Sequence, residues 1–538
     1  RPRRLGSLQM RFSLLCSVVL GMLFGEATVA AGSEKTVRRR APSADEPVII
    51  VGGGLAGLSA AIELIRQDSP VVIIDGEKSL GGNSAKASSG ISACATRTQS
   101  KMGIEDSRDK FFYDTMNAGD RENDETLVDV LVEQSSNAID FLEDLGVDLG
   151  DINLCGGHSV PRTHWIPSPK EGKPLPVGFG IIKALREKVE EARKEKPDSI
   201  RVLLETRVMG LVSWNEYITG VRIRTADGKI EEVSGKAVIL ATGGFASDKG
   251  EDASLLLEFA QDKSDFPTTN GAFARGDGVK MARAMGAQVI GMNRVQIHPT
   301  AFVDPSKPTD NTKFLAAEAL RGKGAILINN SGRRFGNELG RRDYLTGRIL
   351  KECAAFSEDF QKGSGGRPAA VMIMNDVSAD DFGRPAFNFY ANIKKFFTKY
   401  ENSAALAKAM GIEAATLAKT LNEYNEYIDK AASGEKVKDA FEKTVFPHKI
   451  AKEGEAIYAA LVTPAIHYTM GGLKINRNAE VFNEFTNKSF KGLLAAGEVA
   501  GGVHGANRIA GNSLLECVVF GRIAGKTAAT VSYSHQEL

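Results

Sequence analysis

Gly52, Gly54 and Gly57, which have the spacing GxGxxG, are the residues of this chain most typical of a dinucleotide site. In such a site the first glycine permits a tight turn, the second lets the backbone approach a pyrophosphate, and the third lets the following helix pack closely. Asp75, further along, has a carboxylate that can accept hydrogen bonds from ribose hydroxyls. These residues predict a dinucleotide-binding turn, for which a bare structural glycine turn is the alternative.

The segments around these glycines have the order that such a turn requires. Residues 48–51 form a β-branched apolar run typical of a buried parallel strand, and residues 58–65 have helical composition and period. A second run, Val71–Ile74, ends at Asp75. The N-terminus of the helix would offer free N–H groups and a partial positive charge to the phosphates. This order of strand, turn, helix and strand, with Asp75 at the end of the second strand, predicts a Rossmann-like α/β fold.

Small residues further along favour FAD over NAD. Residues 81–84 and 88–93 are rich in glycine, serine and alanine, which suits a loop lying against a flat ring system. A strand-like run at 237–240 leads into Ala241–Phe245, and a late strand at 493–498 returns to the nucleotide. Because these cofactor segments are so far apart, we expect a middle region to be inserted into the nucleotide-binding domain.

Composition excludes several other classes of protein. The chain has 538 residues and a net charge of +1, which gives no electrostatic reason to expect nucleic acid or a membrane surface as a partner. Its length predicts more than one domain, since single cores rarely exceed about 250–300 residues. Its five cysteines form no CxxC pair, which argues against a zinc ribbon, a thioredoxin-like dithiol and covalently attached haem. We therefore expect no metal site, and isolated buried thiols rather than disulfides.

Both ends of the sequence are typical of targeting signals. Met10 is followed by an arginine, an apolar run over 12–25 and small residues, the pattern of a secretory signal peptide at 10–31. The run is shorter than the roughly 20 residues that span a bilayer, so we expect no stable membrane insertion. His535–Leu538 resembles the KDEL/HDEL retention signal. Together these segments, with a polar linker at 32–46, predict the lumen of the endoplasmic reticulum; a membrane anchor and a mitochondrial presequence are the alternatives.

In these and further motifs, the chain resembles the fumarate reductase/succinate dehydrogenase flavoprotein family over residues 45–530. The resemblance is closest to the soluble branch of fungal and trypanosomatid fumarate reductases and bacterial flavocytochrome fumarate reductases. The motifs that carry it are, in order, Gly52–Gly57, Gly81–Asn83, Ala241–Gly244, Gly276–Gly278, His298–Thr300, Ala317–Gly322, Arg334–Glu338, Arg342–Asp343, His467–Gly472 and Gly501–Arg508.

The resemblance implies a Rossmann-like FAD-binding domain at 47–292 and 469–534, with an α+β capping domain inserted at 293–468. The substrate would lie between the two, where a small-ligand site is also expected on general grounds. The Lys/Ala/Glu-rich segment 391–445 would form capping-domain helices with a solvated face. Relatives that attach FAD covalently do so through a histidine in the region matching 83–90; this chain has none there, so FAD should be bound non-covalently.

The glycine turn and the resemblance together imply a set of contacts to FAD. They are Gly52, Gly54, Ala56, Gly57, Asp75, Gly82, Asn83, Ser84, Ser89, Gly90, Thr242, Gly243, Asp277, Glu498, His504, Ser513 and Leu514.

The activity that the resemblance implies is hydride transfer from N5 of reduced FAD to fumarate, giving succinate. Arg508 and His467 match the family positions at one carboxylate, and arginine suits a carboxylate because its planar fork binds both oxygens. His298 matches the position at the other carboxylate, and Gly511 and Gly90 complete the implied substrate contacts.

The proton donor implied by the resemblance is Arg342, with Glu318 and Arg321 relaying protons from solvent. A free guanidinium is a weak acid with a pKa above about 12, so burial and a neighbouring cation would have to ease the loss of its proton. Arg341 is adjacent, so an assignment shifted by one position is the alternative. Ala317 stands where bacterial relatives have a threonine, which removes one hydrogen bond to the substrate.

Structural and functional alternatives stay open at this point. His298, His467 and His504 could be core histidines, and Arg321 and Arg342 could be surface charges, although their motif contexts favour function. Another activity, such as that of a urocanate reductase, an L-aspartate oxidase or a ketosteroid dehydrogenase, is possible, as is a luminal FAD-binding protein without turnover or a purely structural Rossmann domain. The sequence shows no second GxGxxG after a strand and no iron–sulfur cysteine cluster. We therefore expect reduced free flavin, or NADH directly or through a partner, as the electron donor.

Overall fold

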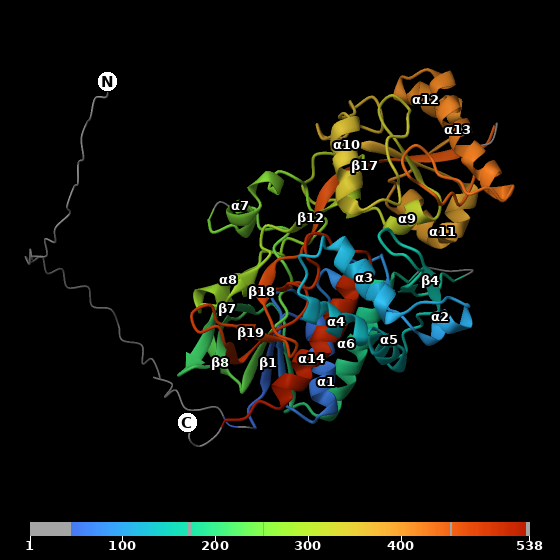
Figure 1. Cartoon of the computed structure of the whole chain (residues 1–538). Helices are drawn as coiled ribbons and strands as arrows, with labels where there is room; N and C mark the ends of the chain where they lie inside the picture. The colour runs from blue at the N-terminus through green and yellow to red at the C-terminus, as the bar shows by residue number, and fades with distance from the viewer. Residues whose placement is uncertain (1–42, 44, 170–174, 251, 452–453, 534–538) are drawn as a thin grey trace, which may run out of the picture. The chain divides into compact units, whose positions relative to one another are not determined.

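The computed structural model describes residues 43, 45–169, 175–250, 252–451 and 454–533. All of them belong to one compact unit, Ala41–Leu538 (Figure 1). The predicted signal peptide at 10–31, most of the linker at 32–46 and the motif at 535–538 lie outside the described residues.

The largest sheet is built around the strands that flank the glycine turn. It has nine strands, with the path β6-β2-β1-β10-β20-β8-β7, β19 beside β20 and β9 beside β8. β1 is parallel to β2 and β10, and β10 is parallel to β20. All residues of β1, β2 and β10 are buried, which is why these central strands are apolar at every position. The strands are β1 (Val48–Val51), β2 (Val71–Ile74), β6 (Ile200–Leu203), β7 (Arg207–Trp214), β8 (Tyr217–Arg224), β9 (Ile230–Ser234), β10 (Ala237–Leu240), β19 (Glu480–Phe482) and β20 (Ser489–Ala495).

This sheet confirms the Rossmann-like α/β prediction. The strands predicted at 48–51, 71–74 and 237–240 are present with those bounds, and the late strand predicted at 493–498 corresponds to the end of β20. Its neighbour β10 lies more than two hundred residues earlier in the chain, since Val238 pairs with Leu493, so the nucleotide-binding sheet is assembled from distant segments, as predicted.

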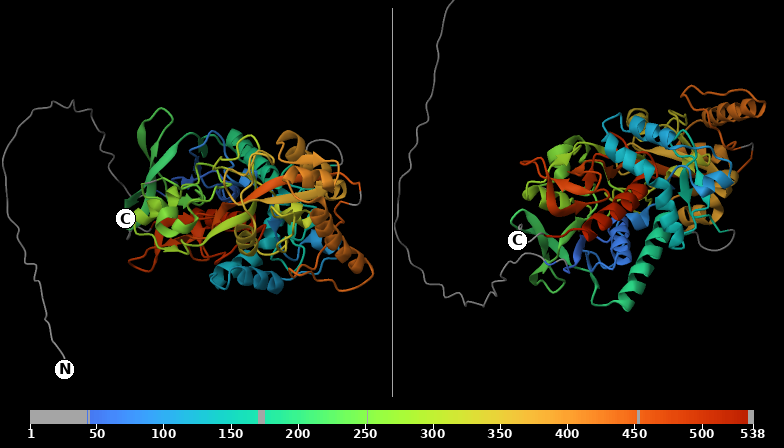
Figure 2. Two further views of the ribbon diagram at one scale, coloured as in Figure 1. Left: turned by 90° about the horizontal axis from the view of Figure 1, so that it is seen from above. Right: turned by 60° about the horizontal axis from the view of Figure 1, so that its bottom comes forward.

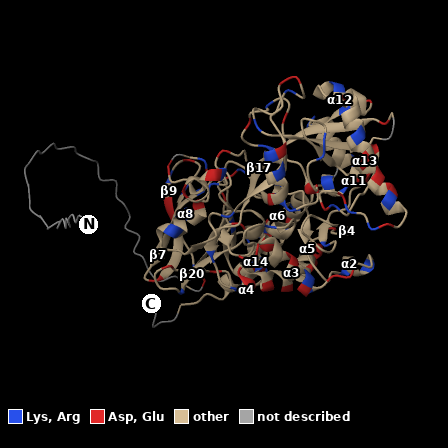
Figure 3. Ribbon diagram, turned by 45° about the horizontal axis from the view of Figure 1, so that its top comes forward, with Lys and Arg blue, Asp and Glu red and all other residues tan. Residues whose placement is uncertain are grey.

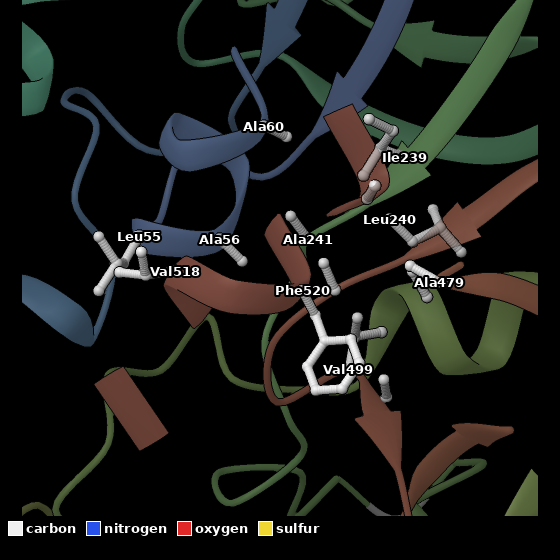
Figure 4. Packing of buried hydrophobic residues seen from close by; sticks show 14 of the residues in the cluster. Leu55, Ala56, Ala60, Ile239, Leu240, Ala241, Ala479, Val499, Val518 and Phe520 are labelled. Carbon is white, nitrogen blue, oxygen red and sulfur yellow. The ribbon is translucent and has the colours of Figure 1, made fainter. Parts of the chain in front are cut away.

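Helices α1 (Leu55–Arg66), α6 (Val177–Glu195) and α14 (Asn512–Ala529) lie together beside this sheet (Figure 2). Figure 4 shows Leu55 of α1 beside Val518 of α14, while the Phe520 ring of α14 lies beside Val499. The two helices approach so closely that a Cβ at Gly521 would lie 2.4 Å from the Ala56 carbonyl oxygen. Glycine at this position therefore allows α14 to pack closely against α1.

A second sheet, of six strands, has the path β13-β12-β17-β15-β14, with β16 beside β17. Its strands are β12 (Val295–Phe302), β13 (Phe314–Leu315), β14 (Ile326–Ile328), β15 (Ala370–Asn375), β16 (Thr398–Tyr400) and β17 (Ile457–Thr469). Its helices are α9 (Glu318–Gly322), α10 (Arg342–Glu352), α11 (Asp376–Asn388), α12 (Ser403–Met410) and α13 (Ala414–Ala432). The Phe302 ring stacks on Phe396 with centroids 4.6 Å apart in a core separate from that of the large sheet.

Two long strands, β12 and β17, carry the chain into and out of this second sheet, and they pair with each other antiparallel. Val295 pairs with Thr469 and His298 with Ala465. The limits 293 and 468 predicted for the capping domain lie close to the ends of these strands and stay a prediction.

The segment 391–445, predicted to be helical, is only partly so. Helices occupy Ser403–Met410 and Ala414–Ala432, whereas the residues before them form the end of the π-helix Phe389–Ile393 and strand β16. Residues 435–443 are not helical: α13 ends at Ala432, Gly434 has a left-handed φ of +89°, and Lys443 is fully buried in an ion pair with Glu338. The exposed positions of α13 carry charges of both signs, as a solvated face requires (Figure 3); they are Lys419, Glu423, Glu426, Asp429 and Lys430.

The remaining elements are short helices and two three-stranded sheets. The helices are α2 (Arg97–Lys101), α3 (Arg108–Ala118), α4 (Glu125–Glu133), α5 (Ser135–Asp144), α7 (Leu255–Phe259) and α8 (Asp277–Ala284). The strands are β3 (Ile91–Ser92), β4 (Asp151–Asn153), β5 (Thr163–Trp165), β11 (Val289–Ile290), β18 (Gly472–Lys474) and β21 (Ala500–Gly501).

The cysteine prediction is confirmed for the described residues. Cys94, Cys155 and Cys353 are buried and Cys517 is half-buried, and all are free thiols. Cys16 lies outside the described residues. Within the described ranges there is no cluster of three or more His, Cys, Asp or Glu side chains suited to a metal ion, and no helix with the length and hydropathy of a membrane span.

Candidate active site

A cavity of about 350 Å³ opens where β1, β2 and β10 end. It is lined by the glycine turn at 52–54, by Asp75, by the loop 82–84 and by the segments 241–243 and 496–498. The carboxyl ends of parallel strands are where ligands bind in open α/β sheets. The segments that the sequence assigned to a dinucleotide therefore surround one cavity.

The glycine turn has the geometry that its spacing predicts. Gly52 has a φ of +104°, and a Cβ on Gly57 would lie 2.0 Å from the Gly52 carbonyl oxygen, so both positions require glycine. Around Gly54, by contrast, the nearest atom to such a Cβ would be the Ser84 Oγ at 4.0 Å, which leaves backbone open toward the cavity. The turn therefore combines close packing on one side with an accessible backbone on the other.

Asp75 holds this turn in addition to lining the cavity. Its Oδ2 accepts a hydrogen bond from the Gly53 N–H at 2.7 Å, and its Oδ1 accepts one from the Glu77 N–H at 2.8 Å. Burial raises the pKa of Asp75 despite these two hydrogen bonds. A carboxylate partly removed from water and still facing the cavity fits the ribose hydroxyls of a nucleotide.

Most, but not all, of the predicted FAD contacts line the cavity. Those that do are Gly52, Gly54, Ala56, Asp75, Gly82, Asn83, Ser84, Thr242, Gly243, Asp277 and Glu498. Those outside its lining are Gly57, Ser89, Gly90, His504, Ser513 and Leu514. The Thr242 Oγ1 is buried and has no hydrogen-bond partner among the described residues. An unpaired hydroxyl, an open glycine backbone and a carboxylate on one cavity wall fit a bound dinucleotide such as FAD.

Two further wall segments were missed by sequence reasoning. Phe273–Arg275 and Arg207–Val208 also line the cavity. Phe273–Arg275 directly precedes the motif Gly276–Gly278, which was a usable signal. The β7 residues Arg207 and Val208 carry no such signal, because only the sheet topology brings them there.

Glu498, at one end of the cavity, is a buried carboxyl with an altered pKa. It accepts hydrogen bonds from the Thr469 N–H at 2.9 Å and the Thr469 hydroxyl at 3.2 Å. Burial outweighs these contacts and raises its pKa to about 7.

The predicted substrate residues come together from distant segments. His298 lies on β12, His467 on β17, and Arg508 in the loop before α14. The rings of His298 and His467 have centroids 5.2 Å apart. His298 is 0% exposed and Arg508 2% exposed, while His467 is half-buried. Arg321 and Arg342 are 1% and 4% exposed, so they are not surface charges, and the functional role of the histidines stays a prediction.

The electrostatics of the two histidines keep both of them neutral. Burial, followed by the charge of Arg342, holds the pKa of His298 and of His467 well below the usual range. The His467 Nδ1 contacts the Thr269 hydroxyl at 2.7 Å, and the His298 Nδ1 contacts Thr300 backbone atoms. Burial and Arg342 also lower the pKa of Arg508 to about 10, so Arg508 stays cationic at neutral pH.

Several donors in and beside this cluster have no hydrogen-bond partner among the described residues. They are the His298 Nε2, the Arg508 Nε and the Arg321 Nε and Nη2. Leaving a buried polar group unpaired costs about 1–3 kcal/mol, and more for a charged group. Unpaired cationic and neutral donors gathered at one place fit an anionic ligand, in particular one with carboxylates.

A buried group of three charged residues lies beside these donors and consists of Arg342, Glu318 and Arg321. Arg342, the first residue of α10, donates through Nε and Nη2 to the Glu318 Oε2 at 3.1 and 3.0 Å. Arg321 lies 3.9 Å from the same oxygen, and its Nη1 donates to the Glu338 carbonyl. The other oxygen of Glu318 accepts from the Gly156 N–H at 2.7 Å.

The charges of these three side chains compensate one another. Burial opposes ionisation of Glu318, but Arg342, Arg321 and the Gly156 amide outweigh it, so the pKa of Glu318 is lowered. Burial, together with the Arg342 charge, lowers the pKa of Arg321. Glu318 is therefore an ionised carboxylate between two buried guanidinium groups, and the lowered pKa of Arg321 makes that residue a stronger acid than usual. Protons can pass between these three side chains.

The neighbouring Arg341 has a different environment. Its Nη1 and Nη2 donate to the Asp120 carboxylate at 2.7 and 3.0 Å, and it also pairs with Asp343. Its side chain is 33% exposed, whereas Arg342 is 4% exposed. The geometry therefore favours Arg342 over the alternative assignment.

Gly511 and Gly90, the other predicted substrate contacts, both have left-handed backbone. Gly511 has a φ of +80°, and a Cβ there would lie 2.2 Å from the Ser92 Oγ. Gly90 has a φ of +79°, and a Cβ there would lie 2.3 Å from the Trp165 ring. Both glycines are required by local packing, and their contact with a substrate stays a prediction.

Sequence reasoning missed Gln296, which joins two parts of this site. Its Oε1 accepts from the Arg342 Nη1 at 2.7 Å, and its Nε2 donates to the Asn507 Oδ1 and the Arg508 carbonyl, each at 2.9 Å. Gln296 precedes His298 by two positions on one strand, so the period of a strand was a usable signal.

His504 supports Arg508 through other side chains. Its Nε2 contacts the Glu516 Oε2 at 2.9 Å, and the same oxygen accepts from the Tyr468 hydroxyl. The Arg508 guanidinium lies 4.5 Å from the centroid of the Tyr468 ring. In this structure His504 therefore contacts the side chains that support Arg508 rather than the cavity.

Comparisons with known proteins agree with this geometry. A family model described as FAD binding domain matches residues 47–514. Fumarate reductase 1 of Saccharomyces cerevisiae is 38% identical over 492 residues, covering 90% of this chain and 98% of the relative. Fumarate reductase of Schizosaccharomyces pombe is 35% identical over 516 residues, covering 94% of each. The open conformation of a flavocytochrome c3 fumarate reductase superposes with a TM-score of 0.68 at 34% identity, covering 90% of this chain and 78% of that one.

Proposed function

The chain belongs to the family of FAD-binding fumarate reductase flavoproteins, and on this premise we propose that it reduces fumarate to succinate with bound FAD. The observation that carries the proposal is the set of buried donors on His298 and Arg508 that have no hydrogen-bond partner among the described residues, beside the buried group of Arg342, Glu318 and Arg321. A small dicarboxylate would satisfy these donors, whereas a steroid would leave them unpaired.

The cavity residues would hold FAD through the glycine turn and Asp75. Bound FAD in its reduced form supplies the hydride. The backbone at Gly52–Gly54 would meet the pyrophosphate, and Asp75 the ribose. We keep the prediction that FAD is bound non-covalently, since no histidine lies between Asn83 and Gly90.

The substrate residues would bind and orient the dicarboxylate. Arg508 would bind one carboxylate with its planar fork, and His467 would add a hydrogen bond at the same end. His298 would donate its unpaired Nε2–H to the other carboxylate. Because both histidines are neutral, they act as hydrogen-bond donors without adding charge, and Arg508 supplies the cation. Ala317 offers no hydroxyl, so the clamp has one hydrogen bond fewer than in the threonine-containing relatives.

The proton would come from Arg342. Arg342 would give a proton to the second alkene carbon and would regain one from Glu318. Glu318 would in turn receive a proton from Arg321, which would receive one from solvent. Glu318 accepts two hydrogen bonds from Arg342, so this return needs no movement of either side chain. One hydride and one proton added across the double bond convert fumarate to succinate.

The test is anaerobic oxidation of a chemically reduced dye by the FAD-loaded protein, with and without fumarate. We expect dye oxidation that depends on fumarate, with succinate formed in equal amount, and much slower oxidation with urocanate or L-aspartate as the additive. Equal rates with and without fumarate would favour an FAD-binding protein without turnover, and a higher rate with urocanate would redirect the proposal to that substrate.

The electron donor and the location are separate proposals. Reduced free flavin is our first candidate for the donor, followed by NADH acting directly or through a partner. Location in the endoplasmic reticulum rests on the residues of 10–31 and 535–538 alone. Imaging of the tagged chain with and without substitutions in these two segments tests it.

A further inference from the structure

His158 lies on the segment between β4 and β5 and is 8% exposed. Its Nε2 is 2.8 Å from the Ala510 carbonyl oxygen, and its Nδ1 is 3.3 Å from the Arg162 Nη1. A guanidinium can only donate, so Nδ1 must be the acceptor and the ring proton must be on Nε2. His158 therefore donates a hydrogen bond to Ala510.

Arg162 fixes this protonation state. It is fully buried and donates to the Asp106 carboxylate through Nε and Nη2, each at 2.9 Å, and to the Asp114 Oδ2 at 2.5 Å. Burial and the Arg162 charge lower the pKa of His158 to about 4. At neutral pH, His158 is consequently an uncharged ring whose tautomer is set by its neighbour.

The Ala510 carbonyl has a second donor on the same side. The Ser92 Oγ donates to it at 2.9 Å, and the Ser92 N–H donates to the next carbonyl, that of Gly511, at 3.2 Å. His158 and Ser92 thus hold the segment that follows Arg508 and leads into α14. A flexible glycine at the next position makes such restraint necessary, because the peptide unit between Ala510 and Gly511 can otherwise rotate.

The direction of this carbonyl determines the direction of the Gly511 N–H. Both belong to one planar trans peptide, in which C=O and N–H point opposite ways. With the carbonyl turned toward His158 and Ser92, the Gly511 N–H points away from them. On the proposed function, Gly511 contacts the substrate, so the orientation of this peptide decides whether its N–H can reach a carboxylate.

We propose that His158 is a positioning residue for substrate binding: by donating to Ala510, it aims the Gly511 N–H at the dicarboxylate and holds the loop that carries Arg508. The same short segment also holds the proton relay, since the Gly156 N–H donates to Glu318. The inference rests on the proposed function and adds to it a residue that never touches the substrate.

The test compares two replacements of similar size, His158→Met and His158→Gln. Methionine removes the donor, whereas the glutamine amide can still donate to Ala510. Two quantities are measured on the FAD-loaded protein: the KM for fumarate, and the dissociation constant of succinate from the change in flavin absorbance. His158→Met should raise both roughly tenfold, the effect of one lost hydrogen bond to the substrate, and His158→Gln should stay within about threefold of the unchanged protein. The pH profile of kcat should be the same in all, since the relay is intact.

His164→Met is the matched control for a purely structural effect. His164 is also buried, on the adjoining strand β5; it contacts the Thr96 hydroxyl at 2.8 Å and the Arg162 carbonyl at 2.9 Å, and does not contact Ala510. We expect it to lower Tm while leaving KM unchanged. The inference is overturned if His158→Met and His158→Gln bind succinate equally, or if His164→Met raises KM as much as His158→Met. If the wild-type protein does not turn over fumarate, the proposed function itself is overturned. That result differs from both outcomes that would overturn the role of His158.

Discussion

Arg342 and Glu318 are joined by two hydrogen bonds to a single carboxylate oxygen, at 3.1 and 3.0 Å, and both side chains are 5% exposed. The carboxylate is kept ionised by the two guanidinium groups and the Gly156 amide around it. Buried ion pairs of this kind contribute little net stability, because desolvation offsets most of the attraction. Their arrangement here is better explained by proton transfer than by stability.

Replacing Glu318 with glutamine should therefore slow turnover more than it weakens binding. Glutamine keeps the size of the side chain and can still accept from Arg342, but it cannot carry a proton. We expect kcat to fall by about 10²–10⁴-fold, the usual contribution of general acid–base groups, with a KM within a few fold of the unchanged protein. Steady-state kinetics on the FAD-loaded protein measure both. Asp343→Asn, an exposed neighbour on α10, is the control and should leave kcat unchanged.

Replacing Arg508 with lysine should have the opposite signature. Lysine keeps the charge but loses the planar fork and the stacking on Tyr468, whose ring centroid is 4.5 Å from the guanidinium. We expect the KM for fumarate and the dissociation constant of succinate to rise by at least about 10²-fold, corresponding to the roughly 3 kcal/mol of a charge-assisted pair. An unchanged succinate affinity would remove Arg508 from the substrate clamp.

The glycine turn gives a prediction that does not depend on the substrate. An alanine at Gly57 would bring its Cβ within 2.0 Å of the Gly52 carbonyl oxygen, so the turn has to shift. We expect Gly57→Ala to purify with little FAD, as judged by absorbance of the flavin. Gly347→Ala, in α10 where a Cβ meets nothing within 4 Å, should retain full FAD content. Normal FAD loading of Gly57→Ala would show that the turn does not bind the cofactor.

The buried histidines predict how stability depends on pH. Burial, in each case the largest cause, lowers the pKa of His158 and His164 to about 4 and that of His298 and His467 well below the usual range. Unfolded histidine binds a proton near pH 6.5, so between about pH 6.5 and 4 the unfolded chain binds more protons than the folded one. The free energy of unfolding should therefore fall as pH falls through this window.

Glu498 acts in the opposite direction over part of the same window. Its pKa is raised to about 7, so its contribution is present at low pH and is lost as pH rises through 7. One carboxyl cannot offset four histidines, and we expect urea unfolding at pH 5 to give a lower free energy than at pH 7. His164→Gln should reduce the difference by up to about 1.4 kcal/mol per pH unit. Greater stability at pH 5 would mean that these histidines are not buried as neutral rings.

Local patterns were enough to predict the nucleotide-binding part of the fold. The glycine turn, β1 and β2 lie within a short stretch of sequence, and each position is specified by its own packing, as the clash at Gly57 demonstrates. The segment 435–443 could not be predicted in this way. Its composition is helical, but Lys443 at its end is paired in the interior with Glu338, more than a hundred residues away, a contact that no local pattern indicates.

The same distinction applies to the site. Motifs predicted the residues proposed to act on the substrate, which are His298, His467, Arg508 and the three relay residues. A motif indicates which residues act together but not which of their atoms are in contact. Gln296 could have been predicted, because it precedes His298 by two positions on one strand and such side chains point to the same face. The hydrogen bond from His158 to Ala510 spans 352 residues, and no local feature of either residue indicates it.

The comparison of Arg342→Ala with Arg341→Ala tests the central claim most directly. The two residues are adjacent, but Arg342 contacts Glu318 in the buried cluster, whereas Arg341 makes partly exposed ion pairs worth about 0–1 kcal/mol. In fumarate-dependent oxidation of a reduced dye, we predict that Arg342→Ala loses at least about 10²-fold in kcat while Arg341→Ala stays within a few fold of the unchanged protein. An Arg342→Ala protein as active as the unchanged one, with FAD bound, would contradict the account.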